Sequence, residues 1–224
     1  MSLSSAFAEP EPLTPGSRRR FSRRQEEVLR VVEAVFLRKG IHAVRIGELA
    51  EEASCSRSTL YELAPSKEAL LLLVLDRMMR RIMRRGAQAI DHAPDPVARV
   101  RAMLTSGALD FAALGPQFLE AIRQYPPARL LFDRRISEGR DALEWLIEDA
   151  VSAGQFRPVN AALVADAIIA ILLRFTDPQF ARSRRISSTN GLAELVDVLL
   201  DGLRPRTTTV DHSGSKSDGS SAGR

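Results

Sequence analysis

Five polar side chains cluster just after a short break near residue 55. Ser56, Arg57, Ser58 and Thr59 are consecutive, and Tyr61 follows Arg57 by one helical turn. An arginine guanidinium can donate two hydrogen bonds to guanine O6 and N7, and serine and threonine hydroxyls can contact base edges or a thymine methyl group. A tyrosine hydroxyl at this position has the reach for a phosphate oxygen. These residue types at this spacing predict contact with double-stranded DNA.

The positive charge of the chain is concentrated around these residues. Residues 18–86 contain 16 Lys and Arg against nine Asp and Glu, a net +7, whereas residues 87–224 carry −1. A local excess of positive charge favours a polyanionic partner, although a solvated basic face without a partner fits the charge alone equally well. Within this block, Lys67 is placed to add a further phosphate contact.

Four predicted helices position these side chains. Apolar residues at three- and four-residue spacing give the first helix one apolar face, and Gly40 is a signal for its end. Ser56 and Ser66 are N-caps for the third and fourth helices, and we expect the fourth to stop before Gly86. A pair of short helices behind a longer one forms a helix-turn-helix, whose last helix enters the major groove. The four helices are predicted over residues 23–39, 46–53, 57–63 and 67–85.

The remainder of the chain is also predicted to be helical. Proline and glycine breaks divide it, and no stretch alternates apolar with polar residues between turns, so we predict an all-α fold without a sheet. These helices are predicted over residues 95–113, 116–124, 127–153, 160–176 and 188–203.

The N-terminal quarter of the chain resembles the DNA-binding domain of the TetR/AcrR family of transcriptional regulators, over the segment RRQEEVLRVVEAVFLRKGIHAVRIGELAEEASCSRSTLYELAPSKEALL. The matching features are Gly40, the apolar-rich stretch 46–50, a Ser-x-x-Thr-Leu-Tyr element at 56–61 and a Pro-Ser-Lys-Glu-x-Leu element at 65–70. Together these motifs are specific, although each alone would be weak.

Some positions differ from the family pattern. Arg45 stands where the family usually has a threonine that caps the second helix, and an arginine there is expected to reach a phosphate instead. Glu62, Leu63 and Ala64 stand where aromatic or histidine residues are common. Glu62 would either be repelled by a phosphate or accept a hydrogen bond from cytosine N4.

The resemblance implies two domains and a two-fold assembly. Residues 23–86 would bind DNA, with the helix-turn-helix at 45–64, and residues 87–206 would form a helical effector-binding and dimerisation domain. The last two long helices would pair with those of a second copy as a four-helix bundle, unless their apolar stripe packs within one chain. The residues of this stripe on the last helix are Leu192, Leu195, Val196, Leu199, Leu200 and Leu203.

Aromatic side chains of the C-terminal helices are candidates for lining an apolar effector pocket, with ordinary core packing as the alternative. The candidates are Phe111, Phe118, Tyr125, Phe132, Trp145 and Phe175.

The two ends of the chain have no periodic pattern. Residues 1–22 are predicted to be a disordered leader that ends in a basic arm, and residues 207–224 a disordered Ser/Gly-rich tail. The arm, which comprises Arg18–Arg20 with Arg23 and Arg24, would either reach the minor groove or form a basic flank.

The composition argues against chemistry elsewhere. The single cysteine, Cys55, excludes an internal disulfide, and we interpret it as a packed turn residue rather than a redox sensor. The three histidines lack metal-ligand spacing, and we find no nucleophile–base pair and no Gly-rich phosphate loop, so we expect no metal, cofactor or enzymatic activity. No apolar run approaches the roughly 20 residues of a membrane span, and no signal peptide is evident, which favours a cytoplasmic protein.

The combined prediction is a homodimeric transcriptional regulator. We expect a repressor that an unidentified small molecule releases from a near-palindromic operator. Two alternatives remain: a helical ligand-binding protein or enzyme with a vestigial DNA domain, and a protein that compacts DNA without regard to sequence.

Overall fold

The computed structural model describes residues 12–14, 19–112, 114–175 and 188–205. Every regular element in these ranges is an α-helix and none is a strand, so the all-α prediction is confirmed. The predicted tail and most of the predicted leader lie outside the described residues. The helices are α2 (Arg23–Lys39), α3 (Ile46–Glu52), α4 (Arg57–Leu63), α5 (Lys67–Asp91), α6 (Pro96–Ala112), α7 (Pro116–Gln124), α8 (Pro126–Ser152), α9 (Ala161–Phe175) and α11 (Ser188–Leu203).

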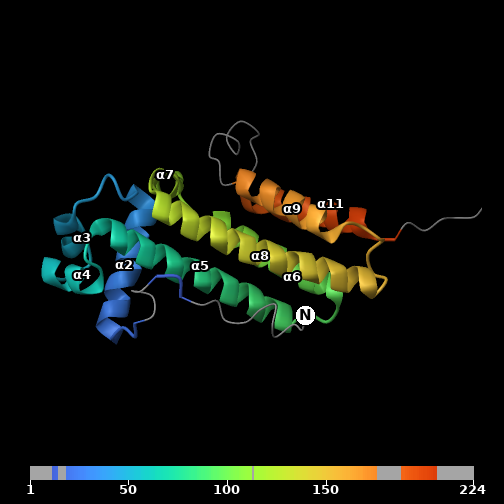
Figure 1. Ribbon diagram of the computed structural model, residues 1–224, viewed down its shortest axis with the longest axis horizontal. Helices are drawn as coiled ribbons and strands as arrows, with labels where there is room; N and C mark the ends of the chain where they lie inside the picture. The colour runs from blue at the N-terminus through green and yellow to red at the C-terminus, as the bar shows by residue number, and fades with distance from the viewer. Residues whose placement is uncertain (1–11, 15–18, 113, 176–187, 206–224) are drawn as a thin grey trace, which may run out of the picture.

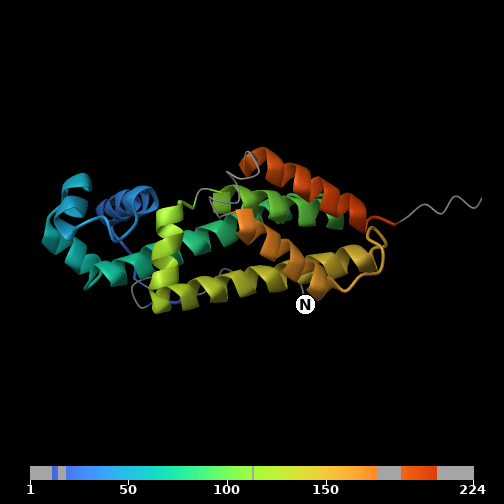
Figure 2. The same cartoon turned by 90° about the horizontal axis from the view of Figure 1, so that it is seen from above.

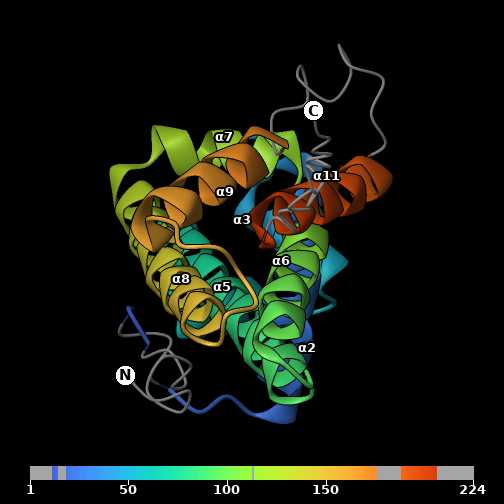
Figure 3. The same cartoon turned by 90° about the vertical axis from the view of Figure 1, so that its right-hand side faces the viewer.

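The molecule is elongated, with α2, α3 and α4 gathered at one end (Figure 1). Helix α5 leaves this end and runs into the body, where α8 and α6 lie along it. Helices α9 and α11 lie over α8 and α6 on the outside of the body, as Figures 2 and 3 show from above and from the end. The long axis of the molecule therefore follows α5 and α8.

Two hydrophobic clusters stabilise this arrangement. The first joins buried residues of α2–α5 to α7 and the first turns of α8. The second joins α6 and the later turns of α8 to α9 and α11. Because the first cluster includes α7 and part of α8, the end formed by α2, α3 and α4 is packed onto the body rather than linked to it by a free segment.

Local signals explain the sharp ends of α2. The Ser22 hydroxyl accepts from the Gln25 backbone N–H, and the Gln25 side chain accepts from the Ser22 backbone N–H at 3.0 Å, which forms a capping box. The helix ends at Gly40, whose φ of 75° is unfavourable for other residues. A Cβ at Gly40 would also lie 2.9 Å from Gln117 Cβ of α7, so this turn fits closely against the body.

Helix α5 is longer than the sequence suggested. We expected it to stop at Arg85, but it continues through Gly86 to Asp91. A helical glycine costs only about 1 kcal/mol relative to alanine. The added turns bury Ile90 in the second cluster and extend the contact with α6, which offsets that cost. The predicted domain boundary at residue 86 therefore falls inside one continuous helix.

Part of the leader is ordered against this helix, contrary to the predicted disorder of residues 1–22. The Leu13 backbone N–H donates to Asp76 Oδ2 on α5 at 3.1 Å. Phe21 packs against the first cluster, and the Arg77 guanidinium lies 5.1 Å from the centre of its ring. Residues 12–14 and 19–22 therefore follow α5 before α2 begins.

Replacing Gly86 with alanine tests the continuity of α5. A Cβ at Gly86 would meet no described heavy atom within 4 Å, so Gly86→Ala is expected to raise the free energy of unfolding by about 1 kcal/mol in urea denaturation at fixed protein concentration.

Gly115→Ala is the opposing control, because a Cβ at Gly115 would collide with the Leu37 carbonyl oxygen and destabilise the fold. Loss of stability in Gly86→Ala would mean that the helix breaks where the sequence suggested.

Candidate nucleic-acid interface and ligand cavity

The turn between α3 and α4 is held by hydrogen bonds to its backbone. Ser54 has a φ of 48°, and the Cys55 N–H donates to the Ala50 carbonyl at 2.9 Å. Arg24 of α2 donates from Nη2 to the carbonyl oxygens of Ser54 at 2.6 Å and Ala53 at 3.3 Å. Arg24, which we had assigned to the basic arm, thus braces the helix-turn-helix from behind.

The five predicted polar residues divide into two groups at the start of α4. The Ser56 hydroxyl accepts from the Thr59 N–H at 3.0 Å and lies 2.9 Å from the Thr59 hydroxyl, so both side chains cap the helix. Arg57 and Ser58 are exposed, and Tyr61 is 53% exposed. The first turn of α4 therefore presents one guanidinium and one hydroxyl to solvent, with a phenol one turn later.

Arg57 lies across the start of α3. A Cβ at Gly47 would come within 2.7 Å of Arg57 Nη2, so Gly47 gives the guanidinium room to approach. The Arg45 side chain is exposed at the N-terminus of α3, where its backbone N–H donates to Glu48 Oε2 at 3.0 Å. These side chains border a shallow hollow lined by Arg45, Ile46, Gly47, Glu48, Glu51, Arg57 and Tyr61. The hollow therefore lies between α3 and α4, on the solvent-exposed side of the helix pair.

Two other predicted cations make contacts within the protein. Lys67 Nζ donates to the Val44 carbonyl at 3.1 Å and links the start of α5 to the loop before α3. Arg19 donates to the Glu62 carbonyl at 2.8 Å, at the end of α4. Arg20 and Arg23 are exposed, whereas Arg18 lies outside the described residues. Within the predicted arm, Arg19 and Arg24 therefore attach α2 to the helix-turn-helix.

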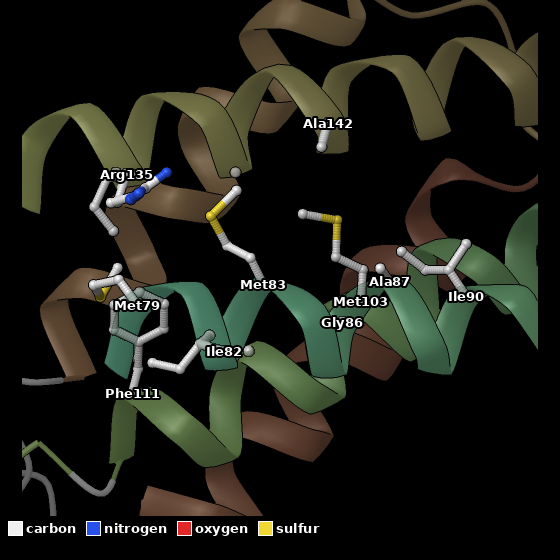
Figure 4. Close-up of a pocket in the computed structure, with 13 residues that line it drawn as sticks. Met79, Ile82, Met83, Gly86, Ala87, Ile90, Met103, Phe111, Arg135 and Ala142 are labelled. Carbon is white, nitrogen blue, oxygen red and sulfur yellow. The ribbon is translucent and has the colours of Figure 1, made fainter. Parts of the chain in front are cut away.

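An apolar cavity of about 100 Å³ lies between α5, α6 and α8 (Figure 4). Its walls include Met79, Met83 and Met103, with Arg135 at one end and Ile90 at the other. Of the six aromatic residues that the sequence suggested for an effector pocket, Phe111 lines this cavity. Phe118 and Phe132 are core residues, Tyr125 and Trp145 pack against the clusters, and the side chain of Phe175 lies outside the description.

One glycine from each of the three helices forms part of the cavity wall. Gly86, Gly107 and Gly139 lie on α5, α6 and α8, and a Cβ at any of them would have no described heavy atom within 4 Å. Close packing therefore does not account for these glycines. Each costs about 1 kcal/mol relative to alanine in a helix, and three alanines would narrow the cavity. The three glycines therefore lower the stability of their helices and keep the cavity open.

A buried ion pair adjoins this cavity. Arg135 of α8 donates from Nη2 to Asp76 Oδ1 of α5 at 2.7 Å, and neither side chain is exposed to solvent. Arg135 Nη1 also donates to Glu138 Oε2 at 2.7 Å. Neither residue was identified from the sequence, although a lone carboxylate within the run Leu70–Met79 was the available signal. The pair joins the helix of the DNA-binding end to α8.

The apolar stripe of the last helix faces inward. Val196, Leu200 and Leu203 are buried in the second cluster, and Leu195 and Leu199 pack against it. The side chain of Leu192 lies outside the description. The buried residues of the stripe therefore cover α6 and α9 of their own chain, which is the alternative that the sequence left open.

Comparison with known proteins decides the family. A model of the tetR family of bacterial regulatory proteins matches residues 28–74, which include α3, α4 and their turn. The HTH-type transcriptional repressor KstR2 of Mycolicibacterium smegmatis is 24% identical over 160 residues, which cover 68% of this chain and 74% of that protein. The chain is a TetR-family transcriptional regulator.

Solved TetR-family structures share the fold over most of their length. The ketosteroid transcriptional regulator KstR2 of Mycobacterium tuberculosis aligns with a TM-score of 0.61 and 16% identity over 84% of this chain and 98% of that one. The fatty acid degradation regulator FadR of Bacillus halodurans aligns with a TM-score of 0.67 and 17% identity over 84% of this chain and all of that one.

The TetR-family relatives are transcriptional regulators rather than enzymes. Within the described ranges, no group of His, Cys, Asp and Glu is arranged to hold a metal ion. No helix of the described part is both long enough and apolar enough to cross a membrane.

Cys55 is expected to react slowly with alkylating reagents. Burial raises the pKa of its thiol, and the charge of Arg24 only partly opposes that effect. Because the thiolate is the nucleophile, iodoacetamide at pH 8 should modify Cys55 several-fold more slowly in the folded protein than in urea, as measured by mass spectrometry. Equal rates would show that the turn does not bury the thiol.

Proposed function

We propose that this TetR-family regulator is a homodimeric repressor that reads a near-palindromic operator with the first turn of α4. The observation that supports this proposal is that the polar residues of the first turn have two separate roles. Ser56 and Thr59 cap the helix, whereas Arg57 and Ser58 face solvent. In this proposal Arg57 contacts guanine, Ser58 contacts a base edge, and Tyr61, Arg45 and Lys67 contact phosphates. Such a repressor acts on the chromosome in the cytoplasm.

Arg57→Ala and Ser58→Ala test base reading. On a duplex that the wild-type protein selects from a random library, Arg57→Ala is expected to cost about 1–3 kcal/mol in binding free energy. On a scrambled duplex it should cost less, because only a phosphate-type attraction is lost. The measurement is fluorescence anisotropy over a range of salt concentrations.

Arg129→Ala is the matched control, since Arg129 is exposed on α8. An unchanged ratio of selected to scrambled affinity in both Arg57→Ala and Ser58→Ala would rule out base reading by α4. A wild-type protein that prefers no duplex would indicate DNA compaction, and one that binds none would indicate a ligand-binding protein or enzyme with a vestigial DNA domain.

We infer that dimerisation uses the outer faces of α9 and α11 rather than the buried stripe. Leu163 of α9 is 68% exposed and Val198 of α11 is 64% exposed. Ala167 and Ala170 are exposed on the same face of α9 as Leu163. An apolar face with small residues suits close packing against the same face of a second copy, and a two-fold dimer matches a two-fold operator.

The double variant Leu163→Asp/Val198→Asp tests this face. Two carboxylates buried without partners are expected to raise the dimer dissociation constant about 100-fold, as measured by sedimentation velocity. Leu130→Asp is the control, because Leu130 is 71% exposed in the first turns of α8. If Leu130→Asp dissociates the dimer and the double variant does not, the interface lies on α8 and not on α9 and α11.

The cavity between α5, α6 and α8 is the proposed effector site, and the effector is proposed to release the operator. Its occupant would contact α5, which also carries the DNA-binding end. An effector that favours the non-binding arrangement by about 1–3 kcal/mol suffices for release. The names of two similar proteins, which refer to ketosteroids and fatty acid degradation, agree with an apolar occupant.

We propose a division into two domains that share α5. In this proposal the DNA-binding domain comprises α2–α4 and the first turns of α5, and the effector and dimerisation domain comprises the rest of α5 with α6, α7, α8, α9 and α11. Helix α5 belongs to both.

A further inference from the structure

The cavity has a polar end and an apolar remainder. Among the described residues that line it, Arg135 carries the one charged side chain, and the others are apolar or glycine. Arg135 lies at the end that Met79 and Phe111 also border, and Ala87 and Ile90 lie at the opposite end. Such a site favours an occupant with an apolar body and a group that accepts hydrogen bonds from a guanidinium.

Asp76, which pairs with Arg135, lies close to other hydrogen-bond donors. Asp76 Oδ1 accepts from Arg135, while Asp76 Oδ2 accepts from the Leu13 N–H at 3.1 Å. Arg80 Nε, one helical turn along α5, lies 3.9 Å from the same Oδ2 atom. Arg135 also holds Glu138, which has a second partner in Arg134. If a ligand carboxylate entered beside Arg135, Asp76 could turn towards Arg80, and the guanidiniums of Arg80, Arg134 and Arg135 would then face three carboxylates.

We propose that the effector is an apolar molecule with a terminal carboxylate, which binds by taking Arg135 from Asp76. This inference rests on the proposed role of the cavity as the effector site. The ligand carboxylate forms a charge-assisted pair with Arg135, Asp76 moves towards Arg80, and no charge is left without an opposite partner.

The size of the cavity favours a flexible chain over a rigid ring system. Its volume of about 100 Å³ is smaller than the roughly 150 Å³ of an engineered cavity that holds benzene. Three of its lining residues, Met79 and Met83 of α5 and Met103 of α6, have unbranched side chains that change rotamer readily. A medium-length alkyl chain can lengthen the space by displacing these side chains, one after another.

The same exchange loosens the leader. Leu13 is held by the carboxylate oxygen that turns towards Arg80, so its hydrogen bond weakens when the ligand binds. Farther along the leader, Arg19 contacts the carbonyl of Glu62 at the end of α4. Leu13 thus contacts the polar end of the cavity, and Arg19 contacts the helix that is proposed to read DNA.

Calorimetry with three eight-carbon probes tests the ligand class. Octanoate, octanol and octylamine have similar apolar bodies but carry a negative, neutral and positive end. Octanoate is expected to bind about tenfold more tightly than octanol, because only its end group pairs with Arg135. Equal binding of octanoate and octanol, tighter binding of octylamine, or no binding of octanoate would each overturn the proposal.

Two variants separate recognition of the carboxylate from occupation of the cavity. Asp76→Leu/Arg135→Met replaces both charges of the pair with apolar groups of similar volume, so neither of the two is left buried alone, and Glu138 keeps its ion pair with Arg134. It should abolish the preference for octanoate over octanol. Gly139→Leu should weaken both probes, because its side chain would enter the cavity without a described obstacle. A double variant that keeps the preference would show that Arg135 does not select the ligand.

Hydrogen exchange reports the coupling to the leader. Octanoate should speed exchange in the peptide that contains Leu13 and leave α11 unchanged; unaltered exchange at Leu13 would overturn the coupling. The proposed repressor function is judged separately from the operator assay without any probe. Intact operator binding with no response to octanoate would reject this ligand class and leave the repressor standing.

Discussion

The unbroken hydrogen-bond ladder of α5 is the constraint on which the rest of the structure depends. Its 25 residues span about 37 Å, from the loop that follows α4 to the far end of the cavity between α5, α6 and α8. A helix resists bending between its ends, so a displacement at the cavity wall reaches the DNA-binding end as a tilt. The pairs of Arg81 with Glu33 and of Arg77 with Glu26 fasten α2 to this helix, so that α2 moves with it.

At the DNA-binding end, four polar side chains that the sequence placed near DNA make contacts within the protein. Arg24 braces the turn, Lys67 holds the loop before α3, and the hydroxyls of Ser56 and Thr59 cap α4. These contacts fix the direction in which Arg57 and Ser58 project. A side chain that reads a base needs a rigid support, because an imprecise position would lose the geometry of a paired hydrogen bond.

The sequence predicted the fold well where local signals decide it. The turn at Gly40 and the prolines that begin α7 and α8 mark helix ends that the structure confirms within a residue. The predicted end of α5 was wrong, because the burial of Ile90 in the second cluster outweighs the low helix propensity of Gly86.

The site was harder to predict, because it depends on contacts between distant residues. The first turn of α4 is a local motif and could be recognised directly. The pair of Asp76 and Arg135 is separated by 59 positions, and the direction of the stripe on α11 depends on which helices cover it. The lining of the cavity was not predicted, because we chose aromatic residues as the candidates. Its walls consist largely of methionines, other aliphatic residues and glycines, which have no distinctive pattern in the sequence.

The close approach at Gly115 has a mechanical consequence. The backbone of Gly115, at the start of α7, lies against the Leu37 carbonyl of α2, so the DNA-binding end touches the body there as well as along α5. A body held at two separate places can rock about the line that joins them, but it resists swivelling. An occupied cavity would therefore drive one defined rocking motion. In a two-fold dimer, the same rotation in both subunits becomes a change in the distance between the two recognition helices.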